Sequence, residues 1–341
     1  MNPARAANQH GFVLVATLWF LAAITIVAAY FADRVGKSVE SAAQSRRMTE
    51  AMVQMAGTRA DTLFHFATDG FSNWGLGFDP VSAIALDDRP YRGVGKDVVR
   101  IQDTRGLLSL NFPDQLLLGR LLSSFGVPGE KHAALFDALA DFTDTDNFRR
   151  LNGAEAPEYA AAGLPPPPNE WLYSPYQLKS VYGWHLLSDL WNDGRFLSLL
   201  TTSRISGFNP NTAPRDILIA LVGKENHQLV DEVIRLRKSN RMLASEKIFA
   251  LVRTYSVESE NVLTFPSNSI RIMQQSPDLP WAQEITLTLT PTLESSPWHI
   301  DYYARRSVSA ITVDGINIPR LSSELSNPEN AIGPPTLRPE S

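Results

Sequence analysis

The stretch ANQHGFVLVATLWFLAAITIVAAYFADR, residues 7–34, contains an apolar run from Phe12 to Phe31 without Asp, Glu, Lys or Arg. At about 1.5 Å per residue, a helix over this run spans roughly 30 Å, the thickness of a bilayer's hydrocarbon core. A secretory signal has a shorter apolar region, about 7–15 residues, followed by small residues at its cleavage site. Tyr30, Phe31 and Asp33 occupy that place here. The run therefore predicts a retained transmembrane helix, with a removed signal or a buried core helix as less favoured interpretations.

The helical pattern continues beyond the apolar run. Small or weakly apolar residues recur at heptad spacing between Val35 and Leu63, but Arg46 and Thr49 interrupt the series. This favours a half-exposed helix that lies against its own domain or a neighbouring subunit over an autonomous coiled coil. The glycines of TDGFSNWGLG, residues 68–77, predict the end of the helix.

Composition excludes several classes of protein. The formal net charge of the 341 residues is −5, whereas a general nucleic-acid binder normally carries a basic excess. The sequence has no cysteine, which excludes disulfides, thiolate metal sites and thiol nucleophiles. The six histidines are scattered, and the Gly-x-Ser-x-Gly, Walker A and Gly-x-Gly-x-x-Gly motifs are absent. We therefore expect no catalytic residues and no enzyme.

The rest of the chain alternates between two kinds of pattern. Residues 91–111 have the pattern of strands, and residues 112–262 have helical spacing in short segments separated by proline and glycine. Strict alternation returns in EITLTLTPTL, residues 284–293, and the following WHIDYYARRSVSAITVDG should pair with it. Strands that flank a block of helices predict an α+β fold, in which an antiparallel sheet is interrupted by a large all-helical insertion.

An acidic segment, ADFTDTDNFRRLNGAE, places three aspartates within six residues and a glutamate shortly after them. Clustered carboxylates supply the oxygen ligands that calcium prefers. The fit to an EF-hand loop is poor, because Phe148 and Arg149 stand near the middle, where glycine belongs. From the residues alone, a solvated acidic turn is the favoured interpretation, and Arg149 and Arg150 are candidates to neutralise it.

A second segment, GFNPNTAPRDILIALVGKENHQLVDEVIRLRKSN, has the form of a helix-hairpin-helix. In DNA-binding proteins such a hairpin places backbone N–H groups on phosphates. The hairpin here, VGKENH, has one glycine only, and the basic residues lie near a helix end. A structural role is favoured: we expect Asn209 and Asn211 to shape the turn and Thr212 to cap the helix that follows.

Four stretches together resemble the K-type minor pseudopilins of the bacterial type II secretion system, and the resemblance covers about residues 10–310. HGFVLVATLWFLAAITIVA looks like a type III signal, and DTRGLLSLN is similar to the family's Asp-x-x-Gly-x-x-Asn-Leu-Asn segment. LADFTDTDNFRRLNGAEAPEY resembles the family's acidic segment, and GFNPNTAPRDILIAL its Asn-x-Asn-Thr-Ala-Pro segment. The acidic segment and the Asn-Thr-Ala-Pro segment, in this order, are fairly specific.

The resemblance implies that the apolar run is processed and then kept. Prepilin peptidase would cut between Gly11 and Phe12, and the new amino-terminal Phe12 would be methylated. The fifth residue from Phe12 is Ala16, where most pilin-like proteins have a glutamate. That glutamate is thought to pair with the amino terminus of the subunit ahead, and an unpaired carboxylate in the hydrocarbon core is costly. Ala16 is therefore a marker of a subunit at the fibre tip, which has no neighbour ahead.

The resemblance also implies a function, partners and a metal. We expect a non-enzymatic subunit at the tip of the secretion pseudopilus that primes its assembly, together with the I- and J-type minor pseudopilins, the inner-membrane platform, prepilin peptidase and membrane lipid. The chain would cross the bacterial inner membrane once, with its C-terminal domain in the periplasm. Similar pseudopilins bind calcium in their helical domain, which makes Asp144, Asp146 and Glu155 the expected ligands and Asp141 a helix residue. The alternative function is that of a membrane-anchored helix-hairpin-helix DNA-binding protein.

The expected domains follow from both arguments. They are a leader (1–11), a transmembrane helix (12–31), a pilin-like helix with the first strands (32–111), a helical insertion domain (112–262), the C-terminal strands (263–318) and a disordered tail (319–341).

Overall fold

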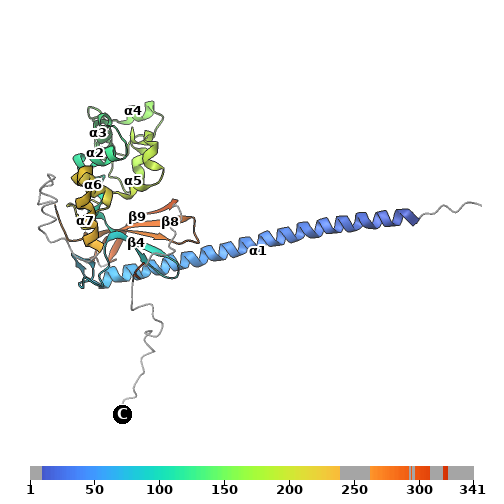
Figure 1. Ribbon diagram of the computed structural model, residues 1–341. Helices are drawn as coiled ribbons and strands as arrows, with labels where there is room; N and C mark the ends of the chain where they lie inside the picture. Colours follow the sequence, from blue (N-terminus) through green and yellow to red (C-terminus); the bar gives the residue numbers. More distant parts are fainter. Residues whose placement is uncertain (1–9, 239–261, 292, 294–295, 308–317, 322–341) are drawn as a thin grey trace, which may run out of the picture. The chain divides into compact units, whose positions relative to one another are not determined.

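The computed structural model describes residues 10–238, 262–291, 293, 296–307 and 318–321. The chain divides into two compact units, residues 1–53 and residues 54–341. Figure 1 shows the long first helix and the mixed helical and sheet body that makes up most of the second unit.

Helix α1 runs from His10 to Thr68, and its apolar part is the one described segment long and apolar enough to cross a membrane. The apolar side chains between Val13 and Phe31 are mostly exposed to the surroundings. The hydroxyls of Thr17 and Thr25 donate to the carbonyls three and four residues before them, so these polar groups are satisfied within the helix. The helix ends at Thr68, which confirms the end predicted from the glycines.

The last turns of α1 belong to the second unit and pack against its sheet. Met55, Thr58, Thr62 and Phe66 recur at helical spacing and are all buried. The hydroxyl of Thr58 accepts a hydrogen bond from the backbone N–H of Val94 at 2.9 Å. This part of the helix is therefore half-buried against its own domain, as the interrupted heptad pattern predicts.

The central sheet has five antiparallel strands in the order β3-β4-β7-β8-β9. The predicted alternation is confirmed, because Ile285, Leu287 and Leu289 are buried on one face of β8, and β9 pairs with that strand. The strands are β3 (Asp87–Arg92), β4 (Val98–Asp103), β7 (Ser269–Gln275), β8 (Trp281–Leu289) and β9 (Trp298–Ser307). Two short strands, β1 (Phe71–Ser72) and β2 (Gly75–Leu76), precede the sheet.

The two faces of this sheet differ in chemistry. Residues of one face pack with Leu63 and Phe66 of α1 in an apolar cluster, and we call it the apolar face; its sheet residues are Val99, Ile101, Ile270, Ile272 and Leu287. The other face carries buried polar side chains that bond to the helical insertion, and we call it the polar face; it includes Gln102, Arg271 and Glu284. Arg271, for example, donates to the carbonyl of Ser198 at 2.6 Å.

The segment between β4 and β7 is mainly helical, and its helices α2 to α5 lie on one side of the sheet (Figure 1). The structure thus has the predicted α+β fold, with one difference from an all-helical insertion. The two-residue strand β6 (Leu200–Thr201) pairs in parallel with β5 (Leu108–Ser109), because the backbone of an irregular segment needs partners where it is buried. The α-helices are α2 (Gln115–Ser124), α3 (His132–Thr143), α4 (Ala156–Ala161), α5 (Arg195–Ser198), α6 (Arg215–Val222) and α7 (His227–Lys238).

Six short 3-10 helices complete the described elements. They are η1 (Thr104–Gly106), η2 (Gly129–Lys131), η3 (Pro175–Ser180), η4 (Trp184–Leu186), η5 (Ser188–Trp191) and η6 (Lys224–Asn226). The insertion has its own core, in which Tyr159, Trp184 and Phe196 are fully buried.

Two of the motifs that carry the family resemblance meet at the buried carboxylate of Asp103. Its Oδ2 atom accepts hydrogen bonds from Asn209 Nδ2 and Thr212 Oγ1, both at 3.0 Å. Its Oδ1 atom accepts from the hydroxyl of Ser267 at 2.6 Å. A Cβ on Gly106 would lie 2.6 Å from the backbone of Thr212, so only glycine allows this approach. The predicted cap was wrong: Thr212 does not cap α6, because its hydroxyl bonds to Asp103 instead.

The first residues of the tail predicted to be disordered are ordered against the sheet. The N–H of Arg92 donates to the carbonyl of Pro319 at 2.8 Å, and the N–H of Leu321 donates to the carbonyl of Arg92 at 3.1 Å. Leu321 is buried in the apolar cluster. Residues 322–341, like residues 239–261 of the predicted insertion domain and the leader residues 1–9, lie outside the described residues, and the other predicted boundaries stay predictions.

Candidate cation site

The acidic segment connects two helices of the insertion. Asp141 lies in α3, as expected, and Asp144 directly follows the last residue of that helix. Asp146 is on the connecting loop, and Glu155 is the residue before α4. Asp144 and Glu155 lie close together in space because the loop between them turns back on the end of α3.

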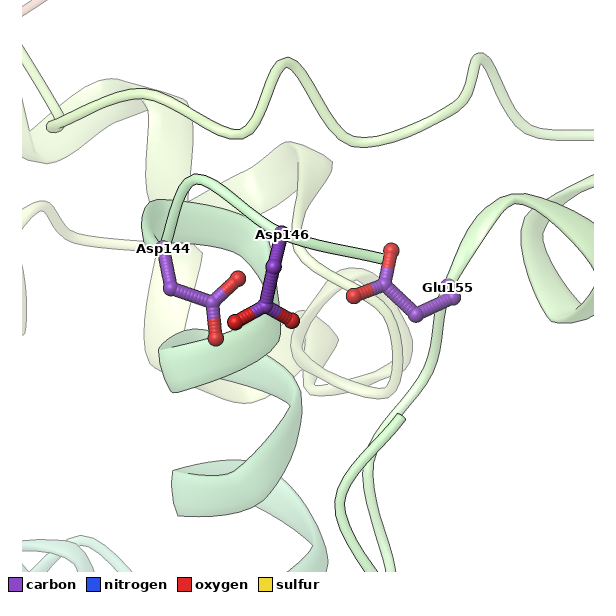
Figure 2. A group of neighbouring side chains, drawn as sticks. All are labelled: Asp144, Asp146 and Glu155. Carbon is purple, nitrogen blue, oxygen red and sulfur yellow. The ribbon is translucent and has the colours of Figure 1, made fainter. Parts of the chain in front are cut away.

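The structure brings the three expected ligands together. One carboxylate oxygen of each of Asp144, Asp146 and Glu155 lies within 4.8 Å of the others. Figure 2 shows the carboxylates of Asp144 and Glu155 directed toward Asp146, which stands between them. Oxygens at this separation can reach a common cation at the 2.3–2.6 Å distances typical of calcium, after small adjustments.

Glu155 has the most unusual environment of the three. Its side chain is 3% exposed, and apart from a capping-box arrangement with the backbone of Glu158, neither carboxylate oxygen has a hydrogen-bond partner among the described residues. Burial raises the pKa of this carboxyl above its usual range, and the negative charges of Asp141, Asp144 and Asp146 raise it further. A buried carboxylate without a partner is costly, and a bound cation is one way to offset that cost.

Arg150 supplies part of the positive charge at this site. Its guanidinium is 2.6 Å from Asp141 Oδ1 and also bonds to Asp144 Oδ2. The hydrogen bonds that Arg150 donates to Asp144 and Asp141 raise the pKa of Arg150. The other oxygen of Asp144 is buried and has no partner among the described residues. Arg150 therefore neutralises Asp141 and one side of Asp144 but leaves Glu155 unpaired.

Sequence reasoning missed a further oxygen at this site. The side-chain amide of Asn169 donates to the carbonyl of Asp146 at 2.6 Å and to Asn147 Oδ1 at 3.0 Å. Asn169 Oδ1 is buried without a partner in the described part of the chain, and the backbone of Asn169 has a positive φ of 53°. Asn169 follows the tetraproline run, so the only available signal was an asparagine after a stiff loop. Asn169 is thereby tied to the loop that carries Asp146, and its unpartnered oxygen is a donor of the hard kind that calcium takes.

The other predicted site residues lie at the start of α1. Gly11, Phe12 and Ala16 are all within this helix. No feature of the described structure bears on cleavage, methylation or a neighbouring subunit, so these three assignments stay predictions.

The structure contains two helices joined by a short connection, as the helix-hairpin-helix pattern predicts. Helices α6 and α7 are joined by η6 after Gly223, whose φ is +88°. Ile217, Leu218 and Leu221 of α6 are buried in the core of the insertion. Of the basic residues on α7, Arg237 is turned toward the protein and donates to the carbonyl of Ala213 at 2.7 Å. These contacts favour the structural role over binding to a nucleic acid.

Two comparisons relate this chain to known proteins. Residues 105–186 match a family model described as type II secretion system (T2SS), protein K. Among solved structures, the chain is similar to a chain of "The Crystal Structure of the GspK-GspI-GspJ complex from enterotoxigenic Escherichia coli Type 2 Secretion System". The alignment covers 78% of this chain and 99% of that one, with a TM-score of 0.52 and 16% sequence identity. No curated protein matches the sequence.

The two findings concern different properties of the chain. At 16% identity, the similarity to the solved chain concerns the fold. The family model matches the sequence itself, and its range includes the acidic segment and most of the motif that begins at Asp103. The resemblance to the K-type minor pseudopilins is therefore confirmed over residues 105–186, which match the protein K model, and the fold of the chain is similar to that of the solved chain.

Proposed function

We propose that this chain is a minor pseudopilin that forms the tip of the type II secretion pseudopilus and primes its assembly. The observation that carries the proposal is the protein K domain within a pilin-like body of one long helix and an antiparallel sheet. The related solved complex joins three components, GspK, GspI and GspJ. The corresponding partners of this chain are minor pseudopilins of the I and J types, and the resulting tip supports protein secretion across the outer membrane.

The proposed location follows from α1. The apolar part of this helix anchors the chain in the inner membrane and contacts lipid, and the second unit lies in the periplasm. Prepilin peptidase cuts between Gly11 and Phe12, the amino group of Phe12 is methylated, and the inner-membrane platform receives the anchored subunit. The exposed apolar side chains of α1 support this reading, because such a surface is unfavourable in water.

The function is tested by isolating the full chain from membranes of a secreting bacterium. I- and J-type minor pseudopilins should co-purify with it, and mass spectrometry should find a mature chain that begins at Phe12. Ala16→Glu adds a carboxylate that has no partner at a fibre tip, so we expect neutral or impaired pseudopilus initiation at matched protein levels. Increased incorporation of this variant along the shaft would contradict the tip position, and a mature start beyond residue 31 would contradict the anchor.

We further propose that Asp144, Asp146 and Glu155 hold a calcium ion, with Asn169 Oδ1 as an additional ligand. The ion would join the end of α3, the following loop and the residue before α4, and would compensate the unpaired charge of Glu155. The support is the set of buried oxygens without partners in the described chain: Asp144 Oδ1, both Glu155 oxygens and Asn169 Oδ1.

The calcium site is tested by thermal unfolding of the detergent-solubilised full chain. Calcium at 100 times its Kd stabilises a native state by about 2.7 kcal/mol, so chelation should lower the Tm of the wild type. Glu155→Gln should lose this response and should be at least as stable as the wild type without calcium, because the buried charge is gone. Glu130→Gln, an exposed glutamate of η2, is the matched control and should keep the response. A calcium-loaded wild type whose Tm does not change on chelation would favour the solvated acidic turn.

A further inference from the structure

A second site lies between the start of β3, the loop after α1 and the Asn-x-Asn-Thr-Ala-Pro motif. A small cavity of about 50 Å³, partly open to solvent, lies there. About 10–15 Å³ of such space is enough for one water molecule, so the cavity can hold one small ion. The polar side chains among its lining residues are Asn73, Asp87, Arg89, Asn211, Thr212 and Arg237.

The cavity contains buried donors that have no acceptor. Arg237, near the end of α7, uses one terminal nitrogen to donate to the carbonyl of Ala213 at 2.7 Å. Its Nε and its other terminal nitrogen are buried and have no partner among the described residues. The side-chain nitrogen of Asn211 is also buried and has no hydrogen-bond partner among the described residues. Leaving a buried donor unpaired is costly, and more so for a charged group, so this arrangement calls for an acceptor.

The charges around the cavity do not balance. Among the described residues, Asp87 is the only acidic one that lines the cavity, and Arg89 already donates to both of its oxygens at 2.8 Å. The guanidinium of Arg89 also donates to the backbone carbonyl of Arg237 at 3.2 Å, which brings the two arginines close together. Two guanidinium groups therefore face one carboxylate. Burial lowers the pKa of Arg237 to about 10, and the charge of Arg89 acts in the same direction against that of Asp87.

We propose that this cavity binds a small monovalent anion of about the size of chloride, held by Arg237 and Asn211. An anion accepts hydrogen bonds from all three free donor groups at once and supplies the missing negative charge. Water supplies an acceptor but no negative charge, so it would leave the charge of Arg237 uncompensated. Bidentate N–H donation from a guanidinium is a favoured geometry for anions.

The anion would have a structural consequence that the proposed secretion function does not include. Asn211 belongs to the motif that bonds to Asp103, Asp87 begins β3, and Arg237 stands near the end of α7. One ion would thus hold the last turn of α7 to the motif.

The test is thermal unfolding of the detergent-solubilised full chain at constant ionic strength. Sodium chloride, bromide, formate and sulfate are compared with sodium gluconate, whose anion is too large for the cavity. Chloride at about ten times its Kd should raise the folding equilibrium constant roughly tenfold, with a higher Tm than in gluconate. A response to chloride and bromide but not to formate identifies a halide site, and a response to formate identifies a carboxylate site. Equal Tm values for the wild type in all five salts would overturn the proposal.

Variants locate the response. Arg237→Gln should abolish it, and Asn211→Ala should weaken it while leaving the backbone hydrogen bond of this turn in place. Arg235→Gln is the matched control: it removes a positive charge from the same helix, but the side chain is 72% exposed, so the response should be unchanged. If Arg237→Gln does not fold, anomalous scattering from bromide-soaked crystals of the wild type replaces it. Bromide absent from the cavity, or an anion response retained in both cavity variants, would refute the site.

Discussion

The two faces of the central sheet are packed with different kinds of side chain, apolar on one face and polar or charged on the other. On the apolar face, Ile101 and Ile272 pack beneath the last turns of α1 in a cluster of aliphatic and aromatic side chains. On the polar face, Glu284 is 2% exposed and accepts hydrogen bonds from Tyr302 at 2.6 Å and Tyr176 at 2.9 Å. The central strands are buried on both faces, but only one of the faces is covered by apolar groups.

This difference indicates which contacts tolerate substitution. Dispersion and hydrophobic burial do not depend on direction, so an apolar contact loses stability in proportion to the atoms that are removed. A buried charge needs a partner of opposite charge in a fixed place, and removing one partner leaves the other uncompensated. The polar face therefore fixes how the insertion sits on the sheet, whereas the apolar face mainly supplies stability.

The largest effect is expected for Glu284→Gln. Arg306, which lies 3.2 Å from the carboxylate of Glu284 and whose side chain is 12% exposed, would keep its charge without a partner. We expect a loss of about 3–5 kcal/mol in the free energy of unfolding, measured from urea midpoints of the full chain in detergent. Tyr302→Phe removes only a neutral donor to the same carboxylate and should cost about 1–3 kcal/mol. If the two variants lost equal stability, the charge pair would not be the decisive contact of the polar face.

A smaller effect of opposite sign is expected for Asp97→Asn, a polar exception beneath α1. Asp97 is fully buried and accepts from Gln274 Nε2 at 3.1 Å, while its other oxygen has no partner among the described residues. Burial raises the pKa of Asp97 from 3.8 to about 6, although hydrogen bonds from Thr58 and Gln274 oppose the shift. The folded state thus holds a proton that the unfolded state releases between these pH values.

The sign of the pH dependence follows. The contribution of Asp97 to the free energy of unfolding is fully present below about pH 4, where Asp97 is protonated in both the folded and the unfolded state. This contribution falls by about 3 kcal/mol as the pH rises to about 6. Asp97→Asn cannot lose a proton, so it should lack this decline and exceed the wild type at pH 7. Urea midpoints of both proteins between pH 4 and pH 7 measure the difference. Parallel curves would show that Asp97 is ionised in the folded protein.

The smallest effect is expected for Ile272→Val on the apolar face. Ile272 is fully buried between its sheet neighbours and the cluster under α1. Removing one methylene group costs about 0.5–1.5 kcal/mol, and the pH dependence should not change. Urea midpoints at one pH suffice for this measurement. A loss comparable to that of Glu284→Gln would remove the proposed distinction between the two faces.

Much of the fold was predictable because its signals are local. The apolar length of α1, the alternation of Ile285, Leu287 and Leu289, and the spacing within α2, α3 and α6 each appear in a single window of sequence. The short strand β6 was missed, since two residues carry no periodicity and its partner β5 is about ninety positions away. The cap expected at Thr212 failed for a similar reason: a distant carboxylate, Asp103, competes for its hydroxyl.

The candidate cation site was predictable in part. Asp144, Asp146 and Glu155 lie in one acidic segment of the sequence, and the family resemblance strengthened the case for a metal there. Composition alone did not separate a solvated turn from a site, because that choice depends on burial and on what Arg150 contacts. The structure shows that Arg150 bonds to Asp141 and Asp144 and leaves Glu155 buried without a partner in the described chain. Asn169 was out of reach, since it lies 23 residues from Asp146.

The sequence by itself determined the apolar helix, the strands with one apolar face, the helical character of the insertion and the acidic segment, because each depends on the period or composition of adjacent residues. Only the tertiary structure decided which polar side chains are buried and what they bond to. Asp103 joins two motifs more than one hundred positions apart, and Glu284 meets Tyr176 of the insertion from a strand of the sheet. The physical reason is that desolvation and hydrogen bonding depend on the surroundings of a group in space, which no local pattern of residues contains.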